Sequence, residues 1–442
     1  MTASETVPGD RTNVDAGKAA TRATYAAFIG AGVAASSWAS RIPQVKDRLH
    51  LDPSELGLVL LAIAAGSIIA LPLAGMVVTH FGSRRTVTIT AVAVGVALWT
   101  VSVGYNAGVA VVVAGLFLFG LAFGSWDVAM NVQGALVEHK TGRSIMPRFH
   151  AGFSLGTVGG ALSGAAMVAL HVPVPADLSV VGLAVALGVP VGVRRFLPDD
   201  AAERVRVSAA APPKGRRLAQ WRETRTVLVG LFVLAFAFAE GTGNDWISVA
   251  VIEGRHTPAA LGTLGYGAFL FAMTAGRWTG PNLITRFGRV VAVRILAAVG
   301  IAGILLFVLG PTVTSAFAGA LLWGAGASLG FPLGMSAGAD DPALAAPRVS
   351  VIASIGYCAF LGGPPFIGFL GNHVTVRYAL LAVGVLFTVS MVISGAIRPL
   401  RPQDHVQLEV PAEPGARPVQ SAQDLTALGS RRSGGREELR LE

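Results

Sequence analysis

Residues 55–79 read ELGLVLLAIAAGSIIALPLAGMVVT, an apolar run whose one charged residue, Glu55, stands at its start. A helix needs about 20 such residues to cross the hydrocarbon core of a bilayer. A membrane-spanning β-strand would instead alternate apolar and polar residues over about ten positions. Because this run is continuous, it predicts a transmembrane helix.

Runs of this kind recur along the whole chain. They lie at 24–43, 55–79, 86–105, 108–136, 149–171, 178–193, 226–250, 260–280, 290–309, 313–335, 349–371 and 376–397. Only 13% of the 442 residues are Asp, Glu, Lys or Arg, compared with roughly 25% in soluble domains. We therefore expect an all-α membrane protein with twelve transmembrane helices, of which the sixth is short.

Several motifs recur at a nearly constant offset. Thr79-His80-Phe81-Gly82 corresponds to Thr285-Arg286-Phe287-Gly288, which lies 206 residues later. Two further sets recur in the same order: Gly115 and Gly120 with Gly319 and Gly324, and Arg148, Ser154 and Gly156 with Arg348, Ser354 and Gly356. This pattern predicts two six-helix bundles, 24–193 and 226–397, in the same orientation, as in transporters built from parallel repeats.

Glycine also follows the helices in regular stripes. Gly152, Gly156, Gly160 and Gly164 recur every four residues, which places them on one face of the fifth predicted helix. Small residues on one face let membrane helices approach closely. Close helix contacts are therefore expected there, and both static packing and a sliding, gating contact fit the pattern.

The positive charges predict the topology. If the N-terminus is cytoplasmic, cytoplasmic segments hold 29 of the 34 Lys and Arg residues, with Arg277 counted beside the loop after the eighth helix. Cytoplasmic loops are enriched in Lys and Arg. We therefore expect a multi-pass protein of the cell membrane with a cytoplasmic tail 1–23, a cytoplasmic linker 194–225 and a disordered cytoplasmic tail 398–442.

The loop after the second predicted helix resembles a known signature. Gly75-Met-Val-Val-Thr-His-Phe-Gly82-Ser-Arg84-Arg85 is similar to the signature loop of the major facilitator superfamily, although Thr79 stands where that family usually has an acid. The resemblance covers residues 24–397 and implies the major facilitator fold. It also implies a gating role for Gly75, Gly82, Arg84 and Arg85.

A second motif narrows the resemblance. Asp127-Val-Ala-Met-Asn131, in the fourth predicted helix, is similar to a pattern of the fucose/proton symporter branch and its YbjJ-like relatives. Gly142-Arg143-Ser144 with the following Phe149-His150, and Glu240-Gly…Asp245-Trp246, also look YbjJ-like. The resemblance implies secondary transport, with Asp127 in the place of the coupling acid, but it names no substrate.

Ionisable residues within the spans are candidates for proton coupling. A carboxylate in the bilayer is costly unless it is paired, hydrated or protonated, so it marks a functional hypothesis. Asp127, Glu240 and His150 are the candidates here, and a packing or anchoring role is the alternative for each. Asp245 is expected closer to the outer interface, where a solvated carboxylate costs little.

Four other side chains are candidates for solute binding. Asn131 follows Asp127 at i+4 and Asn244 follows Glu240 at i+4, so each amide shares a helix face with an acid. Trp126 and Trp246 offer aromatic faces for a sugar-like solute. Helix packing is the alternative for the amides, and packing or interface anchoring for the tryptophans.

The sequence lacks the motifs of several other classes of protein. The chain has no GxxxxGK[ST] loop and no hydrolase or zinc-protease signature, so we expect no enzyme, no cofactor and no metal. The expected partners are a small-molecule solute, protons and the lipid bilayer, without nucleic acid, and we expect a monomer.

We expect proton-coupled uptake of a small polar, for example sugar-like, solute by alternating access. Proton-driven efflux of an amphiphile and a non-transporting receptor are the alternatives.

Overall fold

The computed structural model describes residues 8–141, 145–198, 219–341 and 344–400. The described residues up to Pro399 belong to one compact unit, and this unit alone is considered below. The expected tail 398–442 lies almost wholly outside the described residues, as do residues 1–7 and most of the linker 194–225. The same holds for residues 142–144, which precede Phe149-His150.

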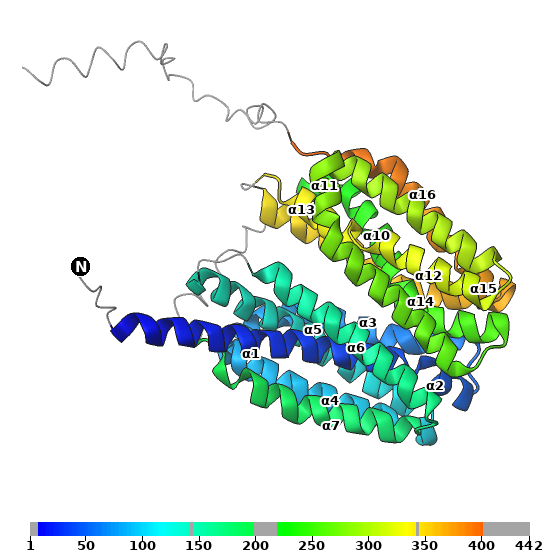
Figure 1. Ribbon diagram of the computed structural model, residues 1–442, viewed down its shortest axis with the longest axis horizontal. Coiled ribbons are helices and arrows are strands. Elements are labelled where there is room, and N and C mark those ends of the chain that lie inside the picture. The colour runs from blue at the N-terminus through cyan, green and yellow to red at the C-terminus, as the bar shows by residue number, and fades with distance from the viewer. Residues whose placement is uncertain (1–7, 142–144, 199–218, 342–343, 401–442) are drawn as a thin grey trace, which may run out of the picture. The chain divides into compact units, whose positions relative to one another are not determined.

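The first half of the unit consists of six long helices and one short one (Figure 1). They are α1 (Pro8–Ala39), α2 (Ile42–Arg48), α3 (Pro53–Phe81), α4 (Ser83–Ala107), α5 (Val109–Thr141), α6 (Met146–Ala169) and α7 (Val174–Gly192). A 3₁₀ turn, η1 (Val193–Arg195), follows α7.

The second half begins with a 3₁₀ turn, η2 (Ala219–Arg222). It continues with α10 (Thr224–Arg255), α11 (Ala259–Leu309), α12 (Val313–Ala327), α13 (Gly330–Gly338), α14 (Ala345–Val374), α15 (Val376–Ala379), α16 (Leu381–Ile393) and η3 (Ser394–Ile397). The 51-residue α11 contains two spans, because the backbone breaks at Gly288.

The spans confirm the expected fold class. Ten segments of the described chain are long and apolar enough to cross a membrane. The break in α11 makes one of them two spans, and α1 supplies the last, so the chain forms twelve transmembrane helices in two six-helix bundles. No β-strand occurs in the described residues.

Two helices differ from the expected bounds. The first helix begins at Pro8, well before the span expected at 24–43, so much of the expected tail 1–23 is helical. The span expected at 313–335 is divided into α12 and α13, and Ser328 and Leu329 lie between them. A break inside a span frees backbone groups, which must find partners in the protein or a cavity.

The internal repeat is visible in the backbone. Gly82, between α3 and α4, has φ 79° and ψ 159°, and Gly288, within α11, has φ 76° and ψ 165°. A positive φ strongly favours glycine, so the same strained turn joins the second span to the third in both halves. Gly120 packs against the Ile63 carbonyl of the second span, and Gly324 packs likewise on Phe269 of the eighth.

The glycine stripe of α6 lies against α1. A β-carbon added at Gly156 would collide with the Ile29 carbonyl oxygen, and one added at Gly160 would collide with the Ser36 hydroxyl. Gly159, which lies off the stripe, has nothing within 4 Å of that position. The close helix contact expected from the stripe is therefore present.

A buried ion pair ties the turn between α1 and α2 to α7. The Nε of Arg41 lies 2.7 Å from the Oδ2 of Asp177, and the two side chains are only 2% and 7% exposed. Arg41 therefore faces the interior of the first bundle and points neither to lipid headgroups nor to an external anion.

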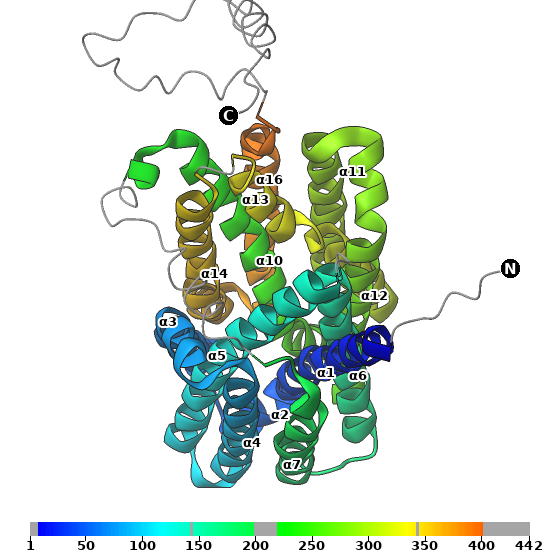
Figure 2. The ribbon, with the colours of Figure 1, turned by 90° about the vertical axis from the view of Figure 1, so that its left-hand side faces the viewer.

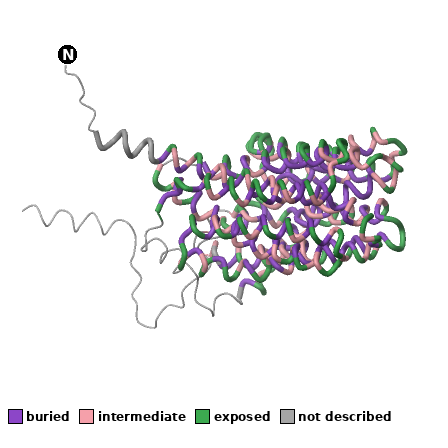
Figure 3. Tube along the Cα trace, turned by 90° about the horizontal axis from the view of Figure 1, so that it is seen from below, coloured by how far each residue is buried: buried purple, intermediate pink, exposed green. Residues whose placement is uncertain are grey.

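The outer faces of the helices are apolar and exposed. Figure 3 shows buried residues concentrated inside the unit and exposed residues along its outside. Large apolar side chains such as Trp99, Leu183 and Val392 are more than half exposed. Because an exposed apolar surface suits lipid, these faces are the ones that contact the bilayer.

The two bundles touch mainly through α3 with α14 and α6 with α11. Gly57 packs on the Pro364–Pro365 backbone, the Thr263 hydroxyl lies 3.5 Å from the Ser40 carbonyl, and Lys46 pairs with Glu253. These residues lie near the ends of helices that point away from the Gly82 and Gly288 turns. We call this end, defined by residues 40–57, 253–263 and 364–371, the closed end. It lies on the right of Figure 1, and Figure 2 views the two bundles from the opposite end.

The opposite end holds the Gly82 and Gly288 turns. Three ion pairs of the described residues at this end lie within the second bundle: Arg289 and Arg225 both bind Asp340, and Arg348 binds Glu223. No ion pair of the described residues joins the two bundles at this end. The contacts between the bundles named above, all among the described residues, therefore lie at the closed end.

Candidate functional site

A cavity of about 350 Å³ lies between the bundles. Its lining comes from α1, α3, α5 and α6 of the first half and from α10, α11 and α14 of the second. Both bundles therefore supply its walls, and any rocking of one bundle against the other would change its shape. Aromatic rings make up much of the lining: Trp38, Phe119, Phe123, Phe153, Tyr266, Tyr357 and Phe360.

Asp127 is the first bundle's ionisable contribution to this cavity. It lies inside the 33-residue helix α5, and its carboxylate accepts a 3.3 Å hydrogen bond from the Nδ2 of Asn131. The same amide donates to the Asp127 carbonyl at 2.8 Å. Among the described residues, no basic side chain pairs with Asp127.

Glu240 lines the cavity from α10 and is already paired. Both its carboxylate oxygens accept a hydrogen bond of 2.9 Å from Arg277 of α11. The Nε of Arg277 also donates to the Ser328 carbonyl, at 3.3 Å. Ser328 lies at the break between α12 and α13, so Arg277 satisfies a freed carbonyl and neutralises an acid at the same time.

Asp245 and Asn244 face the cavity one turn further along α10. The structure gives the Asp245 carboxylate no hydrogen bond and no ion pair among the described residues. The Oδ1 of Asn244 is buried and also lacks a hydrogen-bond partner. Asp245 is therefore a second acid of the cavity wall without a partner among the described residues, and Asn244 adds a buried acceptor next to it in the chain.

The other predicted site residues lie away from the cavity lining. Trp126 and Trp246 are fully buried in the bundles, because each is adjacent to a cavity-facing acid and successive helical residues point about 100° apart. Asn131 is not part of the cavity lining, but its side-chain amide donates to the carboxylate of Asp127, which is. His150 is exposed, and its ring packs edge-on against Phe28 at 5.2 Å.

The loop with the family signature adopts a sharp turn. Gly82 carries the positive φ, and Gly75 lies in open space within the last two turns of α3. Arg84 and Arg85 are exposed at the start of α4. Beside them the hydroxyl of Ser83 donates to Gln133 of α5 at 2.9 Å, which anchors this turn to the helix that carries Asp127.

Sequence reasoning missed Arg277 and undervalued Asp245. Arg277 lies within the interior of α11 and lines the cavity, whereas the charge count had placed it beside a loop. An arginine inside an otherwise apolar span was the signal that could have identified it. Asp245 was expected near the outer interface and instead lines the cavity.

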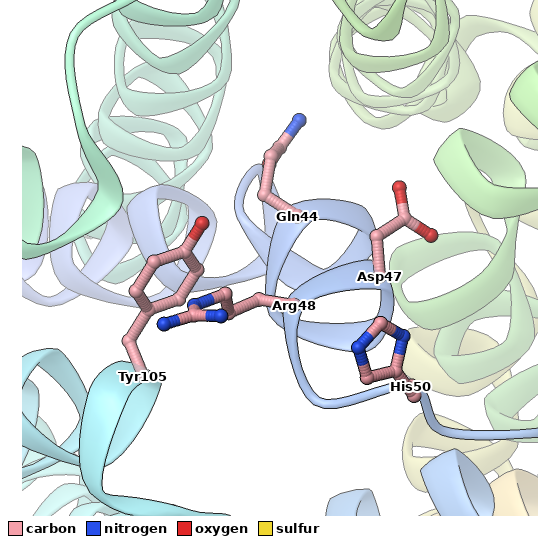
Figure 4. A pocket seen from close by; sticks show the side chains of 5 residues that line it. All are labelled: Gln44, Asp47, Arg48, His50 and Tyr105. Atoms are coloured by element: carbon pink, nitrogen blue, oxygen red, sulfur yellow. The ribbon is translucent and has the colours of Figure 1, made fainter.

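A second, shallow hollow of about 360 Å³ lies at the closed end (Figure 4). Gln44, Asp47, Arg48, His50 and Tyr105 line it. The guanidinium of Arg48 lies 5.9 Å from the centre of the Tyr105 ring and donates to Asn106 at 3.4 Å. Because it is exposed and contains none of the cavity acids, it is not part of the candidate site.

A metal centre has no support in the described residues, which contain no cluster of three or more His, Cys, Asp or Glu suited to hold an ion. The arrangement can hold a small solute between two aromatic walls. It can also exchange protons at unpaired carboxylates and change shape when the bundles move.

This fold and cavity are those of a membrane carrier. The family model of the Major Facilitator Superfamily matches residues 24–358, and the chain belongs to this superfamily. Its members are transporters and not enzymes, in agreement with the expectation from the motifs.

Curated relatives cover most of the chain. The chain is 32% identical to an uncharacterised transporter, y4wD, of Sinorhizobium fredii over 384 residues, which is 85% of this chain and 98% of the relative. It is 30% identical to an uncharacterised MFS-type transporter of Yersinia pestis, with 82% and 92% covered. It is 28% identical to the membrane protein MosC of Rhizobium meliloti, with 80% and 85% covered.

Solved structures share the fold at low sequence identity. The nucleoside transporter NupG matches with a TM-score of 0.68 and 14% identity, covering 86% of this chain and 98% of that one. A point mutant of the fucose:proton symporter FucP of E. coli matches with a TM-score of 0.56 and 16% identity, covering 85% and 97%. At such identities these likenesses concern the fold alone.

Proposed function

We propose that this chain is a proton-coupled carrier that takes up a small polar solute by alternating access. Two features support the proposal. Among the described residues, the contacts between the bundles, such as Gly57 on the Pro364–Pro365 backbone and Lys46 with Glu253, lie at one end, as expected of a carrier open to one side of a membrane. The cavity between them holds a carboxylate, Asp127, without a cationic partner among the described residues.

Asp127 is the proposed proton acceptor. A carboxylate facing a low-dielectric cavity is stabilised either by a cation or by a proton. The described partner of Asp127 is a neutral amide, so no fixed charge holds the carboxylate in its ionised form. The other titratable or charged groups of the cavity lining are Glu240, Asp245, Tyr266, Arg277 and Tyr357. Glu240 is neutralised by Arg277 and is a weaker candidate in this conformation.

The proposed location is the cell membrane, with both termini in the cytoplasm. The positive-inside rule supports this orientation. The closed end then faces outward and the Gly82 and Gly288 turns face the cytoplasm. The conformation described here would therefore be an inward-facing state of a monomeric carrier.

Uptake and export remain separable by experiment. The FucP likeness and the carboxylate of Asp127 favour symport of a polar solute. The aromatic rings of the cavity, among them Phe119, Phe123 and Phe153, favour an amphiphile and support proton-driven efflux as the second candidate. Symport moves protons and solute in the same direction, and antiport moves them in opposite directions.

The test uses the full chain in proteoliposomes. A counterflow screen across sugars, organic amines, organic acids and apolar cations first supplies a transported probe. Asp127→Asn should then abolish accumulation of that probe driven by a pH gradient while counterflow persists, because exchange of loaded carriers requires no net proton movement. Asp47→Asn, an acid-to-amide change at the exposed closed end, is the matched control. Unchanged pH-driven accumulation in Asp127→Asn would refute the coupling role.

A further inference from the structure

The charges of the cavity carry information about its solute beyond its polarity. Of the described residues that line it, Asp127, Glu240 and Asp245 are acids, and Arg277 is the one residue with a permanent positive charge. The guanidinium of Arg277 donates hydrogen bonds to both carboxylate oxygens of Glu240 and to the Ser328 carbonyl. The pair is therefore neutral, and the cavity keeps two further carboxylates.

This balance disfavours an anionic solute. A carboxylate or phosphate group needs a free cation or a set of free donors in the cavity wall. Arg277 is the cation of that lining, and binding an anion through it would require release of Glu240. The released acid would then lie unpaired beside a second negative charge, which is unfavourable in a low-dielectric site.

The unpaired groups instead require a donor. Asp245 has two carboxylate oxygens without a hydrogen bond among the described residues, and the adjacent Asn244 has a buried Oδ1 without one. A neutral hydroxyl could donate to the Asp245 carboxylate, but an ionised Asp245 would then keep an uncompensated charge in a low-dielectric site. An ammonium group offers several N–H donors and neutralises that charge.

We infer that the solute carried in this cavity bears a protonated amine, and that the ammonium group binds the carboxylate of Asp245, which lines the cavity. This inference rests on the proposed function for the identity of the cavity. It assigns different roles to the two unpaired acids, with Asp127 exchanging the proton and Asp245 holding the solute. The cavity volume of about 350 Å³ suits a small amine.

The test compares molecules of similar size that differ in charge. One set is glucosamine, glucose and glucuronate, and the other is phenethylamine, phenethyl alcohol and phenylacetate. Binding to the purified full chain is measured as a shift of the thermal unfolding midpoint over a range of concentrations. The amine of at least one set should stabilise the protein more than its neutral and acidic counterparts.

Two variants test the assignment of residues. Asp245→Asn should weaken amine binding about tenfold or more, because it removes a charge-assisted hydrogen bond, and Asp47→Asn should leave it unchanged. Glu240→Gln frees Arg277, so it should weaken the amine and strengthen the acid of the same set. The inference is overturned if no amine stabilises the protein, if the acid or neutral member binds as well as the amine, or if Asp245→Asn binds the amine normally.

The amine assignment and the proposed transport function would fail in different experiments. Transport of glucose driven by a pH gradient, without an effect of either amine, would overturn the amine assignment and leave the carrier mechanism standing. Amine binding that depends on Asp245 without any counterflow would support the assignment of Asp245 and refute transport.

Discussion

Arg277 donates two hydrogen bonds of 2.9 Å to Glu240, so the acid near the middle of α10 is neutralised by the arginine of α11. The pair lies inside one bundle and forms part of the cavity wall. It therefore fixes the charge of the cavity in the conformation described here, and it leaves Asp127 and Asp245 as the unpaired acids.

Removing both partners of this pair should cost less than the sum of the costs of removing each alone. Loss of one charge from a fully buried pair costs about 3–5 kcal/mol. Because Arg277 and Glu240 keep 26% and 20% of their side-chain exposure, we expect about 1–3 kcal/mol for Arg277→Gln. The double variant Glu240→Gln with Arg277→Gln should be less destabilised than the sum of the two single variants. Thermal unfolding in detergent measures all three, and strict additivity would show that the pair is not coupled.

The Arg41–Asp177 pair should be more sensitive, because its side chains are only 2% and 7% exposed. Asp177→Asn leaves a guanidinium buried without its counter-charge, and we expect a loss of about 3–5 kcal/mol in unfolding free energy. The same acid-to-amide change at exposed Asp47 should have almost no effect. An Asp177→Asn protein that unfolds at the wild-type temperature would contradict the importance of this contact.

The glycine stripe of α6 can be tested by substitution, with a glycine of the same helix that lies off the stripe as the control. Gly156→Ala places a methyl group against the Ile29 carbonyl of α1, whereas Gly159→Ala points into open space. Overpacking typically costs about 1–3 kcal/mol, so Gly156→Ala should lower the unfolding midpoint. Gly159→Ala, three residues further along the same helix, should not. Equal effects of the two substitutions would rule out the close contact between α1 and α6.

Glu223 should make stability depend on pH at the end opposite the closed end. Partial burial alone would raise the pKa of Glu223, but hydrogen bonds from Arg348 and Thr226 and the charges of nearby arginines together hold that pKa below its ordinary value. A lowered pKa adds stability that is fully present above the ordinary pKa of a glutamate and is lost as pH falls through the lowered one.

The measurement compares wild type with Glu223→Gln. Their difference in unfolding midpoint should be largest near neutral pH and should shrink below about pH 4. A difference that grows on acidification would show that the ion pair does not stabilise the ionised glutamate.

Most of the fold could be predicted because hydrophobic length is a local property. The apolar runs locate the spans, and the offset between Thr79–Gly82 and Thr285–Gly288 predicts the repeat, which reappears as matched turns at Gly82 and Gly288. Hydrophobic length does not predict the break at Ser328, but Pro332, four residues later, has no N–H to donate to the Ser328 carbonyl. Arg277, a residue 51 positions away in the chain, donates to that carbonyl instead.

The candidate site could be predicted only in part. Ionisable residues are rare within the apolar spans, and this identified Asp127 and Glu240 as candidates. The i+4 spacing placed Asn244 on the cavity side with Glu240. Rarity alone does not determine which side chains pair with each other. The pairing of Glu240 with Arg277, and the isolation of Asp245, follow from how α10 packs against α11.

The central claim, that the chain is an alternating-access carrier, requires the closed end to open. The Nζ of Lys46 in the first bundle lies 2.5 Å from the Oε1 of Glu253 in the second. We would replace both residues with cysteine in a Cys358→Ser background and join them with a short reducible cross-linker. The control pair, Arg48→Cys with Asn106→Cys, joins two residues of the first bundle at the same end.

Counterflow of the probe in proteoliposomes is the decisive measurement. Cross-linking position 46 to position 253 should stop counterflow, reduction should restore it, and cross-linking of the control pair should leave it intact. Turnover at the uncross-linked rate with positions 46 and 253 fully joined would contradict the account.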